Sequence, residues 1–211
     1  KEEELRRYVD RILKTHPENA FLIDNYLEHA VEVDVDSVFD GEQIHIAGIM
    51  QHIEPAGVHS GDSTAVLPPY SLSDKVIKDI ETYQERIARA MEIVGFLNVQ
   101  YAVKDEKVFI LEANPRSTRT IPFLAKATQR PEAAIGVKVM LGAKLSEFDL
   151  TSKLDCWAIK EPVFPFDKFP GVKKELGPEM KSTGEAIYFA KDFDDEHFKK
   201  PFEFKNLYLT K

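Results

Sequence analysis

The sequence predicts an α+β fold in which a mainly antiparallel sheet is flanked by helices. Two pairs of strand patterns, at residues 31–50 and 97–114, are each joined by a short turn, and strands joined in this way run antiparallel. A long amphipathic pattern at residues 74–94 predicts a flanking helix.

The chain is expected to begin with a helix. In residues 3–17 one helical face collects the apolar side chains Leu5, Tyr8, Val9, Ile12 and Leu13. Residues 20–27 are then expected to form a strand.

A β-hairpin is predicted next. Along residues 31–39 valines alternate with three carboxylates, and an Asp-Gly turn leads into the apolar run at residues 43–50. The face that carries Glu32, Asp34 and Asp36 is interpreted as a solvent-exposed face.

Residues 74–94 form the strongest helical pattern. Ser73 is suited to cap the N-terminal end and Gly95 to end the helix. Two strands, residues 97–103 and 107–114, follow and are joined by a short charged turn.

A further helix is predicted at residues 132–141, between Pro131 and Gly142. Beyond it the chain becomes aromatic and proline-rich, with an acidic run at residues 192–196. Three phenylalanines of this tail are expected to form the core of a short strand layer, and the alternative is a surface that docks a partner: Phe164, Phe166 and Phe169.

Composition argues for an ordinary globular, cytoplasmic protein. The 211 residues are 43% hydrophobic, and 28 basic against 36 acidic residues give a net charge of −8, which argues against nucleic-acid binding. The single cysteine, Cys156, fits a reducing compartment. No apolar run approaches the roughly 18 residues of a membrane span, so no membrane association is expected.

Residues 112–119 (EANPRSTR) carry the chemistry that predicts a function. Glu112 and Asn114 directly follow an apolar strand and offer the hard oxygen ligands that Mg²⁺ prefers, and they share one face of an extended chain. Arg116 and Arg119 add guanidinium groups that match phosphate and carboxylate oxygens. This combination is typical of a metal-nucleotide site.

Gln100 is the third predicted ligand, and its position depends on strand register. If residues 104–107 form a two- or four-residue loop with regular pairing, Gln100 lies opposite Leu111 and faces away from Glu112. A three-residue loop or a β-bulge would instead pair Gln100 with Glu112 on one face. The metal-site hypothesis requires the second arrangement.

Four separated segments resemble the large subunit of carbamoyl phosphate synthetase. They are residues 48–63 (GIMQHIEPAGVHSGDS), 95–103 (GFLNVQYAV), 111–128 (LEANPRSTRTIPFLAKAT) and 177–186 (GPEMKSTGEA). The likeness is to the second, carbamoyl-phosphate-forming half, a member of the ATP-grasp superfamily. In biotin carboxylase, another ATP-grasp enzyme, a glutamate is expected at the position of Gln100, so the neutral amide favours the synthetase.

The resemblance assigns roles to particular residues. It implies that Gln100, Glu112 and Asn114 bind Mg²⁺ or Mn²⁺, with Gln100 and Glu112 reaching the phosphates of ATP through the ions. It implies that Arg116 and Arg119 are catalytic and face the transferred phosphoryl group and the carbonyl substrate.

Further residues are implied to bind the nucleotide. Gly57, Val58, His59 and Ser60 match a loop that lies against it. Asn25 and Leu27 match a hinge strand that meets adenine, and Glu32 matches a carboxylate that contacts the ribose.

The resemblance also implies a division of the chain. Residues 1–19 are expected to be a remnant of the smaller grasp lobe, residues 20–150 the larger lobe, and residues 151–211 a segment that follows the grasp domain. No residues match the glycine-rich smaller lobe, so the chain is expected to belong to a longer enzyme and to be unable to complete catalysis alone.

The implied activity is that of an ATP-dependent ligase in pyrimidine and arginine biosynthesis, which converts carbamate and MgATP into carbamoyl phosphate and ADP. Its implied partners are the remainder of the large subunit and a glutamine amidotransferase small subunit. Two alternatives stay open: a non-catalytic binding or assembly module with a degenerate nucleotide site, or another ATP-grasp ligase of the biotin carboxylase kind.

Overall fold

The computed structural model describes residues 2–18, 20, 23–168, 171 and 173–192, and it confirms the predicted α+β class. Seven strands form one sheet in the order β5-β4-β1-β2-β3-β6-β7, and each neighbouring pair runs antiparallel. The strands are β1 (Val31–Phe39), β2 (Ile44–His52), β3 (Ala65–Leu67), β4 (Gly95–Lys104), β5 (Lys107–Asn114), β6 (Trp157–Val163) and β7 (Gly184–Ala190).

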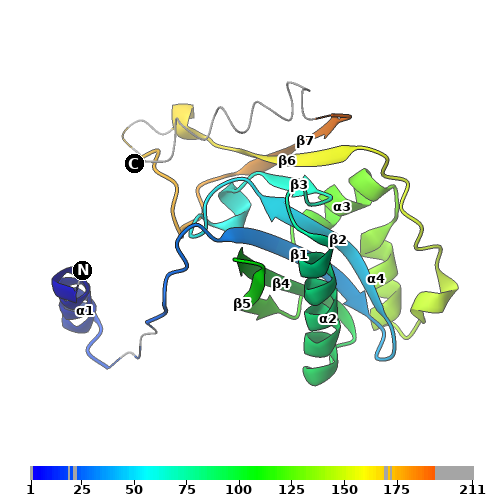
Figure 1. Cartoon of the computed structure of the whole chain (residues 1–211), viewed down its shortest axis with the longest axis horizontal. Helices are drawn as coiled ribbons and strands as arrows, with labels where there is room; N and C mark the ends of the chain where they lie inside the picture. The colour runs from blue at the N-terminus through cyan, green and yellow to red at the C-terminus, as the bar shows by residue number, and fades with distance from the viewer. Residues whose placement is uncertain (1, 19, 21–22, 169–170, 172, 193–211) are drawn as a thin grey trace.

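Helices lie on both faces of the sheet (Figure 1). The predicted helices correspond to α1 (Glu2–Thr15), α2 (Asp74–Ala90) and α4 (Glu132–Met140). A helix that was not predicted, α3 (Thr120–Thr128), directly follows the EANPRSTR motif. Short 3₁₀ segments occupy Ser60–Asp62, Leu145–Glu147 and Phe166–Lys168.

One face of the sheet forms a hydrophobic core with α2. Val76, Ile80 and Ala88 of α2 are buried in one cluster with alternate residues of β1 and β4, which include Val33 and Val99. The predicted cap is confirmed, because the Ser73 hydroxyl accepts a hydrogen bond from the Val76 N–H at 3.3 Å.

The predicted C-terminal end of this helix is wrong. The helix ends at Ala90, and Gly95, with φ of 116°, is already the first residue of β4. Glu92 adopts a left-handed backbone conformation with φ of 51°, which ends the helix, and the flanking Met91 and Val94 are exposed.

The other face of the sheet is covered by α3 and α4. Phe123, Leu124 and Ala127 of α3 pack on Ala47 and Met50 of β2. Val38 and Phe96 form a neighbouring cluster with α3 and α4, in which Ile121, Ile135 and Val139 are buried. Gly136 lets α4 approach the sheet, because a Cβ atom there would lie 2.0 Å from Cζ of Phe96.

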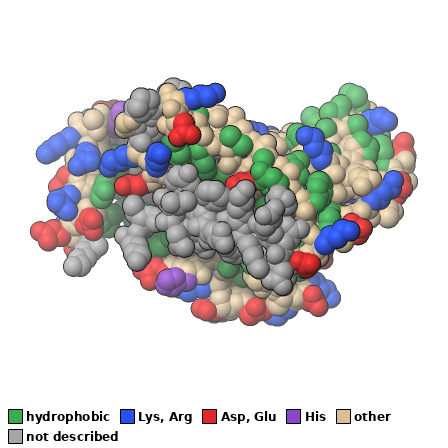
Figure 2. Space-filling view, turned by 90° about the horizontal axis from the view of Figure 1, so that it is seen from above, with side chains coloured by type: hydrophobic (Ala, Val, Ile, Leu, Met, Phe, Trp, Pro, Cys, Tyr) green, Lys and Arg blue, Asp and Glu red, His purple; other side chains and the backbone are tan. Residues whose placement is uncertain are grey.

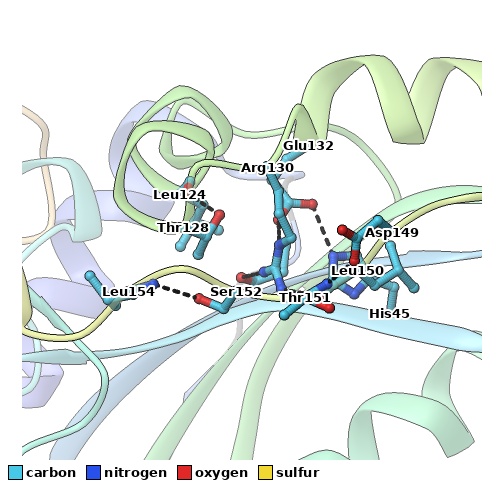
Figure 3. Close-up of polar contacts among 11 residues, drawn as sticks. His45, Leu124, Thr128, Arg130, Glu132, Asp149, Leu150, Thr151, Ser152 and Leu154 are labelled. Atoms are coloured by element: carbon cyan, nitrogen blue, oxygen red, sulfur yellow. Dashed lines mark hydrogen bonds and ion pairs between the residues drawn. The ribbon is translucent and has the colours of Figure 1, made fainter.

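A buried polar cluster fixes the start of α4 (Figure 3). The Glu132 carboxylate lies 3.0 Å from Nε2 of His45 and accepts a 2.7 Å hydrogen bond from Nε of Arg130. The same guanidinium donates to the carbonyl oxygens of Ala47 at 2.9 Å and Leu150 at 2.7 Å. Arg130 therefore joins α4, β2 and the segment that leads to β6.

The predicted strand at residues 20–27 is wrong. Residues 21 and 22 lie outside the described residues, and residues 20 and 23–27 belong to no strand. Ile23 and Tyr26 are 58% and 64% exposed, and no described strand pairs with this segment. A β pattern without a neighbouring strand cannot satisfy its backbone hydrogen bonds in a sheet.

The C-terminal part extends the same sheet through β6 and β7. Phe166 is buried, and its ring stacks on Phe164 with centroids 5.0 Å apart, which supports the interpretation of these side chains as core. Phe169 and residues 193–196 of the acidic run lie outside the described residues.

Helix α1 buries none of its residues and lies apart from the sheet (Figure 1). Basic and acidic side chains are interspersed over the face seen in Figure 2. None of the helices in the described ranges is long and apolar enough to cross a membrane.

The predicted hairpin is confirmed, but its acidic face is not exposed to solvent. Strand β1 lies between β4 and β2, and Asp34 and Asp36 are only 6% and 2% exposed. Burial, and then the charge of Asp34, raise the pKa of Asp36 to about 7, although hydrogen bonds from Thr120, Thr118 and Asn98 act in the opposite direction.

The close approach of α4 to Phe96 predicts the effect of Gly136→Ala. Alanine normally stabilises a helix by about 1 kcal/mol relative to glycine. Here the new methyl group would collide with the Phe96 ring, so we expect a net loss of about 1–3 kcal/mol in the free energy of unfolding. Urea denaturation measures this loss. Gly177→Ala adds a methyl group in open space and should change little; equal stability of the two variants would contradict the packing.

The raised pKa of Asp36 predicts a pH-dependent stability. Between pH 3.8, the ordinary pKa of an aspartate, and pH 7, the approximate pKa of Asp36 in the folded chain, Asp36 is protonated in the folded chain but ionised in the unfolded chain. The contribution of Asp36 to the free energy of unfolding is therefore full below pH 3.8 and is lost as the pH rises through about 7. Asp36→Asn removes the titration. The stability of this variant relative to the wild type, measured in urea, should therefore increase from pH 5 to pH 8.

The exposed Asp24 provides the control for this measurement, because Asp24→Asn changes the same chemical group outside the core. The stability of Asp24→Asn relative to the wild type should be the same at pH 5 and pH 8. A constant difference between Asp36→Asn and the wild type at both pH values would contradict the burial of an ionisable Asp36.

Candidate functional site

A cavity of about 640 Å³ opens between the end of β5, the segment entering α3, the 59–61 loop and β6. Six of the residues predicted from sequence line it: His59, Ser60, Gln100, Glu112, Arg116 and Arg119. Residues that the sequence interpretation did not include also line it, among them Asp34, Asn98, Thr118, Thr120, Lys160, Met180 and Glu185.

The register of β4 and β5 meets the requirement of the metal-site hypothesis. Lys104 pairs with Lys107 across a two-residue turn, which by itself would give regular pairing. A bulge lies between Gln100 and Tyr101, so that Gln100 pairs with Glu112 while Tyr101 pairs with Ile110. Leu111 is the extra residue, and it returns Glu112 to the face of Gln100.

Asn98 and Asn114 form the next pair of side chains on the face that carries Gln100 and Glu112, two residues further along each strand. The Asn114 amide nitrogen donates to Oε1 of Glu112 at 2.9 Å and more weakly to Oδ1 of Asn98 at 3.4 Å. These bonds use the nitrogen of the Asn114 amide, and its oxygen is the atom that remains suited to a cation.

The donor set fits a hard divalent cation that also binds substrate oxygens. It consists of one exposed carboxylate, from Glu112, and the amide oxygens of the half-buried Gln100 and Asn114. No group of three His, Cys, Asp or Glu side chains suited to a metal occurs among the described residues. Mg²⁺ commonly takes one or two carboxylates and completes its coordination with water and phosphate.

The two predicted catalytic arginines line the cavity, and both are exposed to solvent. Arg116 donates to the carbonyl oxygen of Ser117 at 3.4 Å, and Arg119 lies 2.9 Å from the sulfur of Met180. Neither forms an ion pair with a carboxylate in the described part of the chain. Both guanidinium groups therefore remain able to pair with an anion.

The 57–60 loop is held from several sides. Gly57 has φ of 98°, and its N–H donates to Oε1 of Glu32 at 3.0 Å. His59 accepts from the Gly61 N–H through Nδ1 at 3.0 Å. Nζ of Lys160 donates to the carbonyl oxygen of Ser60 at 3.0 Å, which ties the loop to β6.

Five residues predicted to bind nucleotide, and the predicted metal ligand Asn114, do not line this cavity. Gly57, Val58 and Glu32 lie in or against the adjoining loop, where Val58 is buried and Glu32 is half-buried. Asn25 and Leu27 belong to the segment before β1, which contacts the same loop through a 2.7 Å hydrogen bond from the Tyr26 hydroxyl to the Ala56 carbonyl oxygen.

Lys160 is a buried cation that local sequence did not indicate. It lies on β6, is 1% exposed, and burial lowers its pKa. Glu185 and Asp34 act in the opposite direction on that pKa. A signal was available in β6, because Lys160 directly follows the apolar run Trp157–Ile159. Its contacts, however, come from segments distant in sequence.

Comparison with known proteins identifies the family. The chain matches "Carbamoyl-phosphate synthase L chain, ATP binding domain" over residues 1–148. It is 53% identical over 200 residues to the carbamoyl phosphate synthase large chain of Archaeoglobus fulgidus, covering 94% of this chain and 19% of that protein. It is 50% identical over 210 residues to the carbamoyl phosphate synthase large chain, C-terminal section, of Methanocaldococcus jannaschii, covering 94% and 34%.

Two solved structures have the same fold at low sequence identity. N5-carboxyaminoimidazole ribonucleotide synthetase from Thermus thermophilus has a TM-score of 0.69 and 13% identity, with 97% of this chain and 58% of that chain covered. Biotin carboxylase from Campylobacter jejuni has a TM-score of 0.68 and 12% identity, with 95% and 50% covered.

These likenesses confirm the predicted ATP-grasp architecture of an antiparallel sheet with flanking helices. The chain spans 19% of the Archaeoglobus protein and 34% of the Methanocaldococcus protein. With the family match extending over residues 1–148, the chain belongs to the family of carbamoyl-phosphate synthase L chain ATP binding domains.

Proposed function

We propose that the chain is part of the ATP-dependent, carbamate-phosphorylating half of a carbamoyl phosphate synthetase. The observation that carries this proposal is that Gln100 and Glu112 share one face of the sheet and line one cavity with two arginines that pair with no described carboxylate. Asn114 follows on that face, beside the cavity, and contacts Glu112. The likeness to a C-terminal section supports the assignment to the second half of the large subunit.

The reaction converts carbamate and ATP into carbamoyl phosphate and ADP. A carbamate oxygen forms a bond to the γ-phosphorus, and the bond from that phosphorus to the bridging oxygen breaks, so that its electron pair leaves with ADP. Such a transfer needs little covalent participation by the protein, which has to align the groups and neutralise charge. Arg116 and Arg119 are suited to this task because both are exposed to the cavity.

Gln100, Glu112 and Asn114 are the proposed ligands of Mg²⁺ or Mn²⁺. When bound, the ion would reduce the negative charge of the phosphate oxygens and help to orient them. The single carboxylate leaves a bound cation with net positive charge, which favours phosphate oxygens as its further ligands.

His59 and Ser60 are proposed to contact the nucleotide from the loop side of the cavity, where Lys160 holds the Ser60 carbonyl group. Gly57, Val58 and Glu32 are proposed to support this loop next to the nucleotide. For Asn25 and Leu27, the hydrogen bond between Tyr26 and Ala56 supports a position close to the loop, consistent with an adenine contact.

The working enzyme is proposed to contain the remainder of the large subunit and a glutamine amidotransferase small subunit, in the cytoplasm. The share of the relatives' length that the chain spans supports the first of these partners. The stacked and buried Phe166 argues against a tail that serves mainly to dock a partner.

Glu112→Ala in the intact enzyme tests the proposed function. Loss of the only carboxylate among the proposed ligands should weaken metal-nucleotide binding and reduce ATP formation from ADP and carbamoyl phosphate by at least about 100-fold. The initial rate of ATP formation at saturating Mg²⁺ measures this effect.

Glu81→Ala is the matched control, because it removes an exposed carboxylate from α2, away from the cavity. It should retain wild-type activity. Retained ATP formation by Glu112→Ala would instead favour a non-catalytic module.

A further inference from the structure

Asp36 occupies an unusual position beneath the cavity. Its carboxylate is 2% exposed and forms no ion pair with a cation among the described residues. A buried carboxylate without a cation is costly, and folding alone would be served as well by an apolar or amide side chain. The contacts of Asp36 therefore indicate what the carboxylate does.

Two threonine hydroxyl groups converge on this carboxylate. The Thr118 hydroxyl oxygen lies 2.9 Å and 3.0 Å from its two oxygens, and the Thr120 hydroxyl donates to Oδ2. The two hydroxyl groups also lie 2.7 Å from each other. Asp36 thus holds the first residue of α3, Thr120, and also Thr118, which lies between the two arginines.

The segment that carries the arginines has few other attachments. Residues 115–117 and 119 are exposed, and Arg119 precedes α3 without a side-chain capping bond. The Arg116 N–H donates to the carbonyl oxygen of Asn114 at 2.8 Å. Within the described chain, the other hydrogen bonds from residues 115–119 to the sheet end on Asp36.

Asn98 connects this arrangement to the proposed metal ligands. Its amide nitrogen donates to Asp34 at 2.7 Å and to Asp36 at 3.1 Å. Its amide oxygen faces the Asn114 nitrogen at 3.4 Å, and Asn114 in turn contacts Glu112. One chain of hydrogen bonds therefore runs from the arginine segment to the metal-binding edge of β5.

We infer that Asp36 is a positioning residue, which holds Arg116 and Arg119 at the reacting phosphoryl group through the hydroxyl groups of Thr118 and Thr120. The inference rests on the proposed function. Asp36 does not line the cavity; it sets the distance between the guanidinium groups and the proposed metal ligands. Small misplacements of such groups reduce the rate of the chemical step more than they reduce nucleotide binding.

The test uses the intact enzyme and the formation of ATP from ADP and carbamoyl phosphate. Asp36→Asn and Thr118→Val should lower kcat by about ten-fold or more and leave KM for ADP within about three-fold of the wild type. Thr118→Ser keeps the hydroxyl group and should restore most of kcat. Thr118 is only half-buried, so Thr118→Val keeps the test decisive even where Asp36→Asn does not fold.

Ser37→Ala is the matched control. Ser37 is the next residue of β1, is equally buried, and hydrogen-bonds to Leu97 and Gln84 on the opposite face of the sheet. It should lower the midpoint of thermal unfolding at least as much as Thr118→Val without the loss of kcat.

Two results with an active wild-type enzyme would overturn this inference and leave the proposed function intact. One is a full kcat in Thr118→Val, and the other is an equal loss of kcat in Thr118→Ser and Thr118→Val. A wild-type enzyme that forms no ATP would overturn the proposed function, and the inference would fall with it.

Discussion

One extra residue in β5 decides whether Gln100 and Glu112, the proposed metal ligands, lie on the same face of the sheet. The two-residue turn between β4 and β5 would by itself turn Gln100 and Glu112 to opposite faces of the sheet, because side chains alternate along a strand. The bulge at Leu111 shifts the register by one residue, so that Gln100 pairs with Glu112 and both side chains lie on one face. The arginines follow directly on the same chain, so their approach to the ligands depends on that correction as well.

The second constraint is the double burial of β1. Helix α2 covers one face of this strand with an apolar core, whereas the other face carries Asp34 and Asp36 beneath the cavity. These carboxylates act as hydrogen-bond acceptors for groups that reach the cavity from β4 and α3. A buried, hydrogen-bonded polar network therefore lies beneath the cavity, next to the residues proposed to meet substrate.

Local patterns were sufficient for much of the fold. The hairpin of β1 and β2 and the helices α2 and α4 were predictable because their periodicity, caps and turns lie within a few residues. The strand expected at residues 20–27 failed because a strand needs a partner, which local pattern does not supply. Helix α3 escaped prediction because its buried residues are recognisable only once the sheet beneath it is known.

The site divides in the same way. Glu112, Asn114, Arg116 and Arg119 were predictable because they are neighbours in sequence, whereas the position of Gln100 depended on the register of β4 and β5. Asp36 is separated by 82 residues from Thr118, and Lys160 by 100 from Ser60, so only the tertiary structure reveals these contacts. The alternation of β1 was misinterpreted as a solvent face because it does not reveal that α3 lies over it.

The central claim is that Gln100, Glu112 and Asn114 share a divalent cation with a nucleotide. A crystal of the intact enzyme grown with Mn²⁺ and a non-hydrolysable ATP analogue, measured at a wavelength where manganese scatters anomalously, tests it most directly. The account predicts an anomalous peak within bonding distance of the Glu112 carboxylate and the Gln100 amide oxygen, bridged to the phosphates. Bound nucleotide with no manganese peak at these side chains would contradict it.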